Sequence, residues 1–106
     1  MSSNPEDTKL QVLASATKTR SGATSAAALR DSTGRTYVAI PVLSGDFSVD
    51  ALQAVLVVAK ASQIQGIEAV VVAGVQPSTE SLNLIRGESP SALILWVNTE
   101  NQLISL

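Results

Sequence analysis

One segment constrains the fold of this chain more than any other. Residues 49–62 read VDALQAVLVVAKAS, with apolar side chains on almost every side of a helix. A strand of this length would be unusual, so the segment is predicted to be a helix. A helix that is apolar nearly all round is buried on more than one side. One side can pack on a sheet, and the other needs a neighbouring helix or another subunit, because each fully buried valine or leucine contributes roughly 1.5–3 kcal/mol.

The remaining core must also be built from small aliphatic side chains. Of 106 residues, 45% are hydrophobic but only 3% are aromatic, which suits closely stacked helix and sheet layers. The length predicts one domain over residues 1–106. No strictly apolar run is longer than that of residues 54–59, which is too short to cross a bilayer, and the polar N-terminal residues do not resemble a signal peptide. We therefore expect a cytoplasmic protein with no membrane partner.

Local signals divide the chain into helices and strands. Asn4 and Ser78 are suited to cap helices, and the turn sequence DSTG predicts an antiparallel hairpin between its flanking strands. Residues 67–73 are apolar except for Glu68, as expected for a central strand covered on both faces. The expected elements, in chain order, are a helix over 5–18, strands over 24–31 and 36–42, a helix over 49–62, a strand over 67–73, a helix over 79–86, a strand over 91–97 and a short strand over 102–106.

The stretch before the apolar helix is expected to be a loop. Pro41 favours an end to strand pairing, residues 44–46 (SGD) are predicted to be irregular, and Ser48 is the expected cap of the next helix. The whole order, α-β-β-α-β-α-β-(β), predicts the α/β class, with one mixed sheet of about five strands and helices on its faces.

Two residue types are absent, and their absence excludes much chemistry. The chain contains no histidine and no cysteine. Histidine is the usual general base near neutral pH, and cysteine supplies thiolate nucleophiles and zinc ligands. Cysteine-histidine catalysis, Ser-His-Asp triads and conventional zinc sites are therefore excluded. The net charge of −2 also gives no electrostatic basis for a nucleic-acid partner.

Certain short strings, in this element order, resemble the cytidine deaminase family over about residues 10–106. The family begins with G-A-A-L, a D-G turn and Y-x-G-x-N-[IV]-E. In this chain AAAL over residues 26–29, Gly34 of the turn and YVAIPVL over residues 37–43 stand at those places. The family then has an apolar strand followed by P-C-x-x-C. Here PSTES over residues 77–81 follows the apolar strand, so Ser78 and Ser81 stand at the two cysteines.

The family's C-A-E-R-x-A motif, which opens a buried helix, matches in two registers. Fitting Ala54 to the last alanine puts Val49 at the cysteine and Ala51 at the glutamate. A shift of one residue puts Asp50 and Leu52 there instead.

The resemblance implies a three-layer α/β/α, cytidine deaminase-like fold, but not the activity. In the family a protein-bound Zn²⁺ activates water and a glutamate moves the proton. In this chain neither register supplies the first ligand as cysteine or histidine, or the glutamate. Pro41 and Leu43 stand where the family's asparagine and glutamate hold the ribose. The resemblance therefore implies a degenerate member with no catalytic residues, metal or cofactor. It leaves a vestigial pocket, whose expected residues are Pro41, Leu43, Asp50, Ser78 and Ser81.

Several residues have a functional and a simpler interpretation. Asp46, Asp50 and Glu80 could supply oxygen ligands for Mg²⁺ or Ca²⁺, but acidic residues early in a helix more often interact with its dipole. Lys60 could activate a serine, but a lysine that ends a buried helical run more often seeks solvent. Trp96 ends an apolar strand, where core or interface packing is expected.

Three functions follow from these observations. The first is a non-catalytic protein that acts through homo-oligomerisation or an unidentified protein partner, as a homodimer or larger assembly built on the helix over 49–62. The second is a protein that binds a small, nucleoside-like molecule in the vestigial pocket. The third is a zinc-dependent cytidine deaminase, which the family label alone would suggest.

Overall fold

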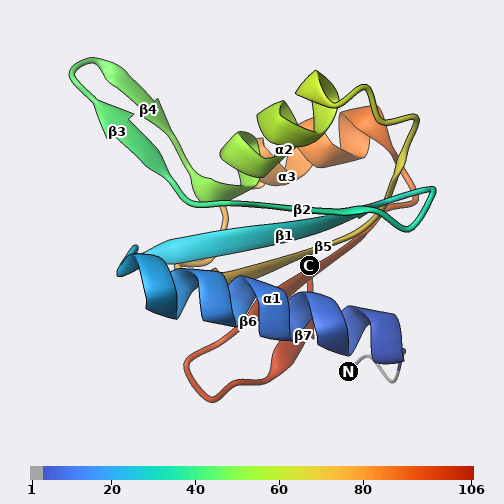
Figure 1. The fold of residues 1–106 in the computed structure, drawn as a ribbon, viewed down its shortest axis with the longest axis horizontal. Coiled ribbons are helices and arrows are strands. Elements are labelled where there is room, and N and C mark those ends of the chain that lie inside the picture. The colour runs from blue at the N-terminus through green and yellow to red at the C-terminus, as the bar shows by residue number, and fades with distance from the viewer. Residues whose placement is uncertain (1–3) are drawn as a thin grey trace.

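The computed structural model describes residues 4–106, which form three helices and seven strands (Figure 1). Five strands make one sheet, in the order β2-β1-β5-β6-β7, and the other two form a separate hairpin. Within the sheet β5 and β6 are parallel and the other neighbours are antiparallel, which confirms the predicted mixed α/β sheet. The elements are α1 (Pro5–Ser21), β1 (Ser25–Asp31), β2 (Thr36–Ala39), β3 (Val42–Ser44), β4 (Phe47–Val49), α2 (Ala51–Ala61), β5 (Ile67–Gly74), α3 (Thr79–Glu88), β6 (Leu93–Val97) and β7 (Leu103–Ser105).

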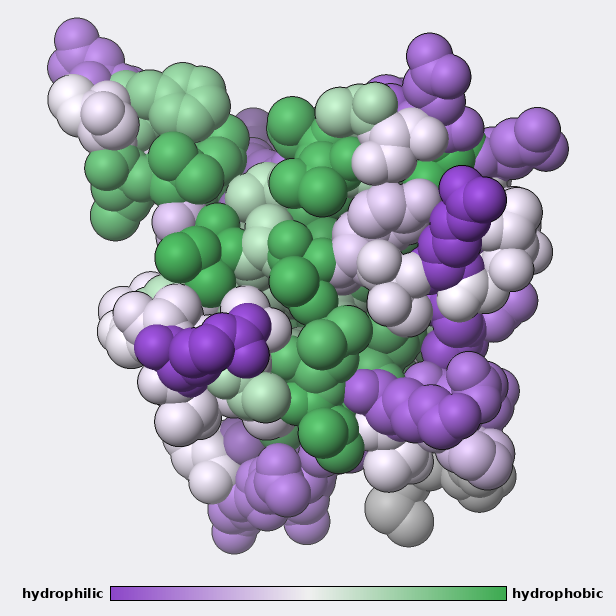
Figure 2. Space-filling model, viewed as in Figure 1, coloured by the Kyte–Doolittle hydropathy of each residue, from purple (hydrophilic) through white to green (hydrophobic). Residues whose placement is uncertain are grey.

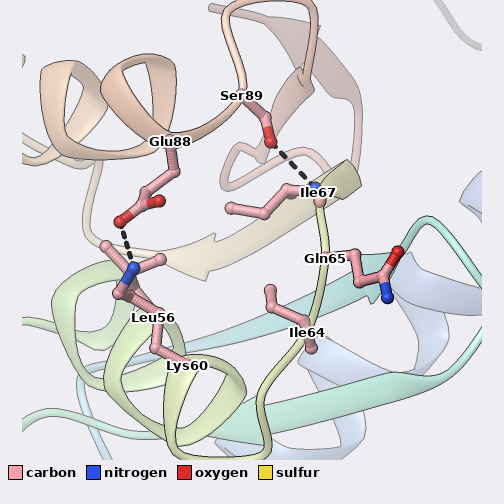
Figure 3. Close-up of a pocket in the computed structure, with 8 residues that line it drawn as sticks. Leu56, Lys60, Ile64, Gln65, Ile67, Glu88 and Ser89 are labelled. Carbon is pink, nitrogen blue, oxygen red and sulfur yellow. Dashed lines mark hydrogen bonds and ion pairs between the residues drawn. The ribbon is translucent and has the colours of Figure 1, made fainter.

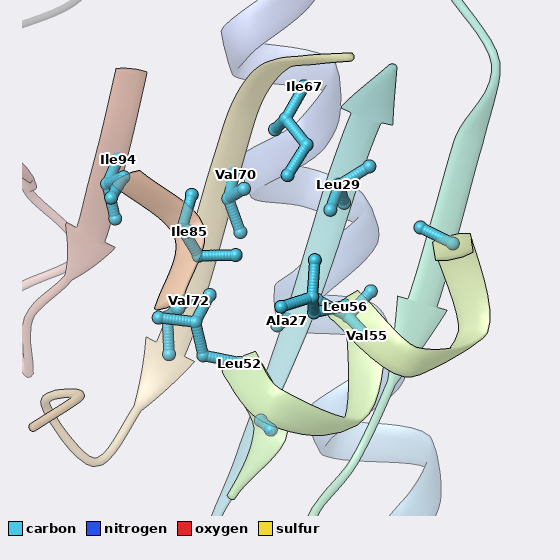
Figure 4. Close-up of a cluster of buried hydrophobic side chains, with 12 residues drawn as sticks. Ala27, Leu29, Leu52, Val55, Leu56, Ile67, Val70, Val72, Ile85 and Ile94 are labelled. Atoms are coloured by element: carbon cyan, nitrogen blue, oxygen red, sulfur yellow. The ribbon is translucent and has the colours of Figure 1, made fainter. Parts of the chain in front are cut away.

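The helices cover both faces of the sheet, with α1 on one face and α2 and α3 on the other (Figure 1). Adjacent residues of a strand point to opposite faces. In β1, Ala27 and Leu29 therefore pack under α2, whereas Ala28 packs against α1. Figure 4 shows the core under α2 and α3, in which Ile85 is the buried contribution of α3. This arrangement gives the three predicted layers, with β5 as the central strand of the sheet.

Helix ends follow the local sequence signals in most places. The Asn4 side chain accepts a hydrogen bond from the Glu6 backbone N–H, as predicted for a cap. Helix α1 continues to Ser21 and ends at Gly22, whose φ of 73° suits glycine. Helix α3 runs through Gly87 rather than stopping before it. No helix in residues 4–106 has both the length and the apolar character needed to cross a membrane.

The segment between β2 and α2 differs from the prediction. Strand β2 ends at Ala39, and residues 42–49 form an antiparallel hairpin instead of a loop and a first helical turn. Gly45, at φ 60°, occupies the first central position of a two-residue turn, as a type II′ hairpin requires. We call residues 42–49 the β3–β4 arm, because it projects from the body (Figure 1).

Helix α2 consequently begins at Ala51, and its cap is Asp50 rather than Ser48. The Asp50 carboxylate accepts a hydrogen bond from the Gln53 backbone N–H at 2.7 Å, and the Gln53 side chain accepts one from the Asp50 N–H at 2.9 Å. This reciprocal pair is a capping box, which satisfies two backbone donors and fixes the first turn. Val49, predicted as helical, lies in β4.

Candidate functional site

The N-termini of α2 and α3 carry three polar side chains that contact one another. The Ser78 hydroxyl donates to the Ser81 hydroxyl at 3.1 Å, and the Ser81 hydroxyl donates to Oδ2 of Asp50. Asp50 caps α2 and Ser78 caps α3, so both helix starts are fixed by members of this group. We call these residues the Asp50–Ser78–Ser81 cluster.

Each polar group of the cluster is already engaged within the protein. Ser81 is 1% exposed, Asp50 is half-buried and Ser78 is exposed. One carboxylate oxygen of Asp50 accepts from the Gln53 N–H and the other accepts from Ser81. The Ser78 oxygen also accepts from the Ser81 backbone N–H at 3.2 Å. The cluster is therefore a satisfied capping network that joins two helices.

A cavity of about 240 Å³ lies beside the cluster. Asp50 and Ser78 line it together with apolar side chains of the sheet and the loop that follows β5, among them Val72 and Val75. Leu52 lines it from the first turn of α2 and is 1% exposed. The cavity therefore has polar groups at the helix N-termini, and Ser25 and Gln76 add polar groups among its apolar walls.

The structure brings together only part of the pocket expected from the sequence. Asp50, Ser78 and Ser81 meet, although Asp50 and Ser81 are 31 residues apart in the chain. Leu43 lies on the β3–β4 arm with 76% of its surface exposed, and Pro41 precedes the arm. Neither residue lines the cavity, because the chain leaves the sheet after β2.

Proteins of one known family resemble this chain in sequence pattern and in fold. A sequence model of the family described as "Cytidine deaminase-like" matches residues 3–101. The chain belongs to the cytidine deaminase-like family. No curated protein matches it.

Solved cytidine deaminases have the same fold as this cytidine deaminase-like chain. The enzyme from Burkholderia pseudomallei is 16% identical, with a TM-score of 0.80 over 100% of this chain and 92% of that one. The enzyme from Bacillus anthracis is 14% identical, with a TM-score of 0.74 over 97% and 83% of the two chains. The enzyme from Mycobacterium leprae is 14% identical, with a TM-score of 0.73 over 96% and 94%. At these identities the likeness shows the fold alone.

The other candidate residues of this cytidine deaminase-like domain make none of the hydrogen bonds of the cluster. Within residues 4–106, no three His, Cys, Asp or Glu side chains gather closely enough to hold a metal ion. Asp46 is in the turn of the arm, and Glu80 is exposed on the first turn of α3. The Trp96 indole donates to the Gly74 carbonyl at 2.8 Å.

Lys60 lies near the C-terminal end of α2, opposite the cluster. Its ammonium forms an ion pair with Glu88 across the ends of α2 and α3 (Figure 3). A crevice of about 70 Å³ separates the two ends, and there the Ser89 hydroxyl accepts from the Ile67 backbone N–H at 2.9 Å. Since both side chains of the pair are about half exposed, the ion pair contributes little to stability.

Two buried polar groups were not anticipated from the sequence. Arg30 of β1 is 5% exposed and forms ion pairs with Asp7 of α1, at 2.9 Å, and with Glu68 of β5. Burial alone would lower the pKa of the Arg30 guanidinium, but the hydrogen bonds to Asp7 and Glu68 outweigh it and raise the pKa above its usual value. Arg30 Nη1 is the one buried side-chain nitrogen or oxygen in residues 4–106 without a hydrogen-bond partner.

The second group is Asp31, at the turn between β1 and β2. Burial alone would raise the pKa of its carboxyl, but hydrogen bonds from the Thr33 hydroxyl, the Arg35 and Thr33 backbone N–H groups and the Tyr37 hydroxyl together lower it. Asp31 therefore holds the turn as a charged acceptor. The DSTG string could have predicted this role, because aspartate commonly bonds to the backbone two residues on.

Proposed function

We propose that this chain is a non-catalytic member of the cytidine deaminase-like family that acts by assembling with itself. The observation that carries the first half is the chemistry of the Asp50–Ser78–Ser81 cluster. The resemblance puts Ser78 and Ser81 at two zinc ligands, and one of its two registers puts Asp50 at the third. The contact between Asp50 and Ser81 supports that register, since Val49 belongs to the arm.

The residues of the cluster do not fit a catalytic zinc. Zinc in proteins is held by thiolates, imidazoles and carboxylates, whereas serine hydroxyls are neutral and poor ligands. The cluster offers one carboxylate and two hydroxyls, and these groups satisfy one another. The supported register puts Leu52, and the other puts Ala51, at the proton-transferring glutamate. Both side chains are buried and neither ionises.

Self-assembly is supported by apolar surface on α2. Most of this helix packs on the sheet, but Val57 is 62% exposed and Val58 is 41% exposed. Figure 2 shows hydrophobic surface over α2 and the neighbouring part of the body, and further hydrophobic surface on the arm. Contiguous apolar surface of this kind marks an interaction site in most proteins that expose it.

Two measurements on purified protein test the proposal. We expect no stoichiometric zinc by elemental analysis after growth with added zinc, because the site lacks suitable donors. We expect light scattering after gel filtration to give a mass of at least twice the 11.0 kDa of one chain at micromolar concentration. One zinc per chain would overturn the non-catalytic half, and a mass of 11.0 kDa would overturn the assembly half.

The cavity beside the cluster favours a second candidate function, binding of a nucleoside-like molecule. Its mixture of polar groups, among them Asp50 and Ser78, and apolar walls would suit a small amphipathic ring. Cytidine at millimolar concentration should then raise the melting temperature by mass action. A Val75→Trp variant, in which the larger ring occupies the cavity, is the control and should show no shift. Equal behaviour of both proteins would exclude this candidate.

A further inference from the structure

The β3–β4 arm is structurally separate from the body. Its two strands pair with each other and with no strand of the main sheet. Val42, Leu43 and Phe47 are respectively 44%, 76% and 58% exposed. A lone two-stranded hairpin is marginally stable in water and needs packing against another element. The arm therefore has the apolar side chains of a buried element, but these side chains are exposed in the single chain.

The apolar side chains of the arm lie on both of its faces. Directly opposed residues of an antiparallel pair point to the same side. Val42 is opposite Val49 and Ser44 is opposite Phe47, so these four residues share one face. Leu43, opposite Ser48, lies on the other face. Packing one face of the arm against a flat surface would leave the other face in water.

The surface beside the arm matches this two-sided shape. In Figure 2 the arm stands off from the body, and an indentation separates it from the surface over α2. Val57 and Val58 of α2 are also apolar and exposed. One copy thus carries a projecting apolar element and, between it and α2, a recess.

We propose that the arms of two copies interlock, each lying between the partner's arm and the partner's α2. This inference rests on the proposed self-assembly and specifies its geometry. A surface with a projection next to a recess is complementary to itself under two-fold rotation, so both arms are covered at once. An unrelated partner would have to carry a projection and a recess of matching shape.

The available area is consistent with a dimer. Val42, Leu43, Phe47, Val57 and Val58 together expose on the order of 500 Å² per copy, against about 800 Å² per partner in an interface of standard size. The arm backbone and its serines, which are also exposed, supply polar area around this apolar centre. Such an apolar centre with a polar rim is the usual composition of a stable interface.

Engineered cysteines provide the test, because the chain has none of its own. One chain carries Ser44→Cys on the arm, a conservative change. A second chain, distinguished by a tag, carries Val57→Cys on α2. After mixing, oxidation or a short bis-maleimide should join the two different chains, which is possible only between copies. The matched control replaces Val57→Cys with Leu84→Cys, an apolar residue of α3 that is 45% exposed, and should give at least tenfold less mixed product.

A second pair of variants measures the contribution of the arm to assembly. Leu43→Ser with Phe47→Ser should convert the dimer to a monomer by light scattering, whereas the control Leu84→Ser should remain a dimer. Both changes are at exposed positions, so the far-ultraviolet circular dichroism should be unchanged.

The outcomes separate the two proposals. A monomeric wild type would overturn self-assembly and the interlock with it. A dimeric wild type whose arm variants stay dimeric, with mixed cross-links no stronger than in the Leu84→Cys control, would overturn the interlock and leave self-assembly standing.

Discussion

Introducing thiolates at the Asp50–Ser78–Ser81 cluster should create a zinc site. The two serine oxygens are 3.1 Å apart, and Ser81 contacts Asp50 directly. Changing all three residues to cysteine therefore directs three sulfur atoms toward one point, where a zinc ion with Zn–S distances of about 2.3 Å and one water would complete a tetrahedron.

The magnitude follows from what the three side chains now do. The change removes the caps of α2 and α3, at about 1 kcal/mol each. It also removes the Ser81–Asp50 hydrogen bond, which is buried at Ser81 and contributes about 1 kcal/mol. The metal-free variant should therefore be about 3 kcal/mol less stable than wild type, which lowers the melting temperature by roughly 12 °C or more. Zinc at a thousand times its dissociation constant should add about 4 kcal/mol and restore the melting temperature to wild type or above.

Thermal unfolding followed by circular dichroism, with zinc or with a chelator, measures this effect. The matched control changes Asp50, Ser78 and Ser81 to alanine, which removes the same caps and supplies no ligand. Zinc should raise the melting temperature of the cysteine variant only, and elemental analysis should find one zinc per chain in that variant. A folded cysteine variant that responds to zinc no more than the alanine control would refute the convergence of the three positions.

Three further predictions concern stability. Replacing Arg30 with methionine should cost 3–5 kcal/mol in urea unfolding, about the value for breaking a buried pair, because the Asp7 carboxylate stays buried without its guanidinium; a loss below about 1 kcal/mol would contradict this. Because the pKa of the Asp31 carboxyl is lowered by folding, the carboxylate stabilises the fold above the unfolded value of about 3.9, and this contribution is lost as pH falls through the folded value. Below about pH 4 the urea midpoint of Asp31→Asn should therefore fall less steeply with pH than that of wild type. Parallel curves for the two proteins would disprove the role. Gly74→Ala should cost about 2 kcal/mol or more by thermal unfolding, since φ is 100° and a Cβ would lie 2.2 Å from the Thr24 carbonyl oxygen; a variant as stable as wild type would show that the backbone can move.

The sequence predicts the main sheet well because its signals are local. The apolar run of β5 indicates a strand covered on both faces, and the caps Asn4 and Ser78 mark two helix starts. These features depend on residues close in the chain. The class and the five-strand sheet follow from them, and so does the order of the elements outside the β3–β4 arm.

The arm was missed because the apolar pattern does not change where β4 ends and α2 begins. Val49 belongs to a strand and Leu52 to a helix, yet both fit one helical run. Two signals mark the true boundary: Gly45 in a two-residue turn between short apolar segments, and the capping box of Asp50 with Gln53. Reading them together would have predicted the hairpin and the correct start of α2.

The cluster and the buried ion pair depend on tertiary contacts. Ser78 and Ser81 are three residues apart, but Asp50 joins them only because α2 and α3 begin at the same end of the fold. Arg30 and Asp7 are 23 residues apart, and a charged residue in β1 gives no local sign that it will be buried. Sequence patterns can identify such residues only when a resemblance supplies the pairing.

Cytidine turnover decides whether the chain is catalytic. Purified protein at micromolar concentration, with zinc supplied, is incubated with cytidine for hours, and the loss of cytidine is followed by ultraviolet absorbance. If the chain is non-catalytic, the rate should equal that of the Asp50→Ala variant and of buffer alone. Reproducible turnover above both, abolished by the Asp50→Ala change, would show that the cluster is an active site and would contradict the central claim.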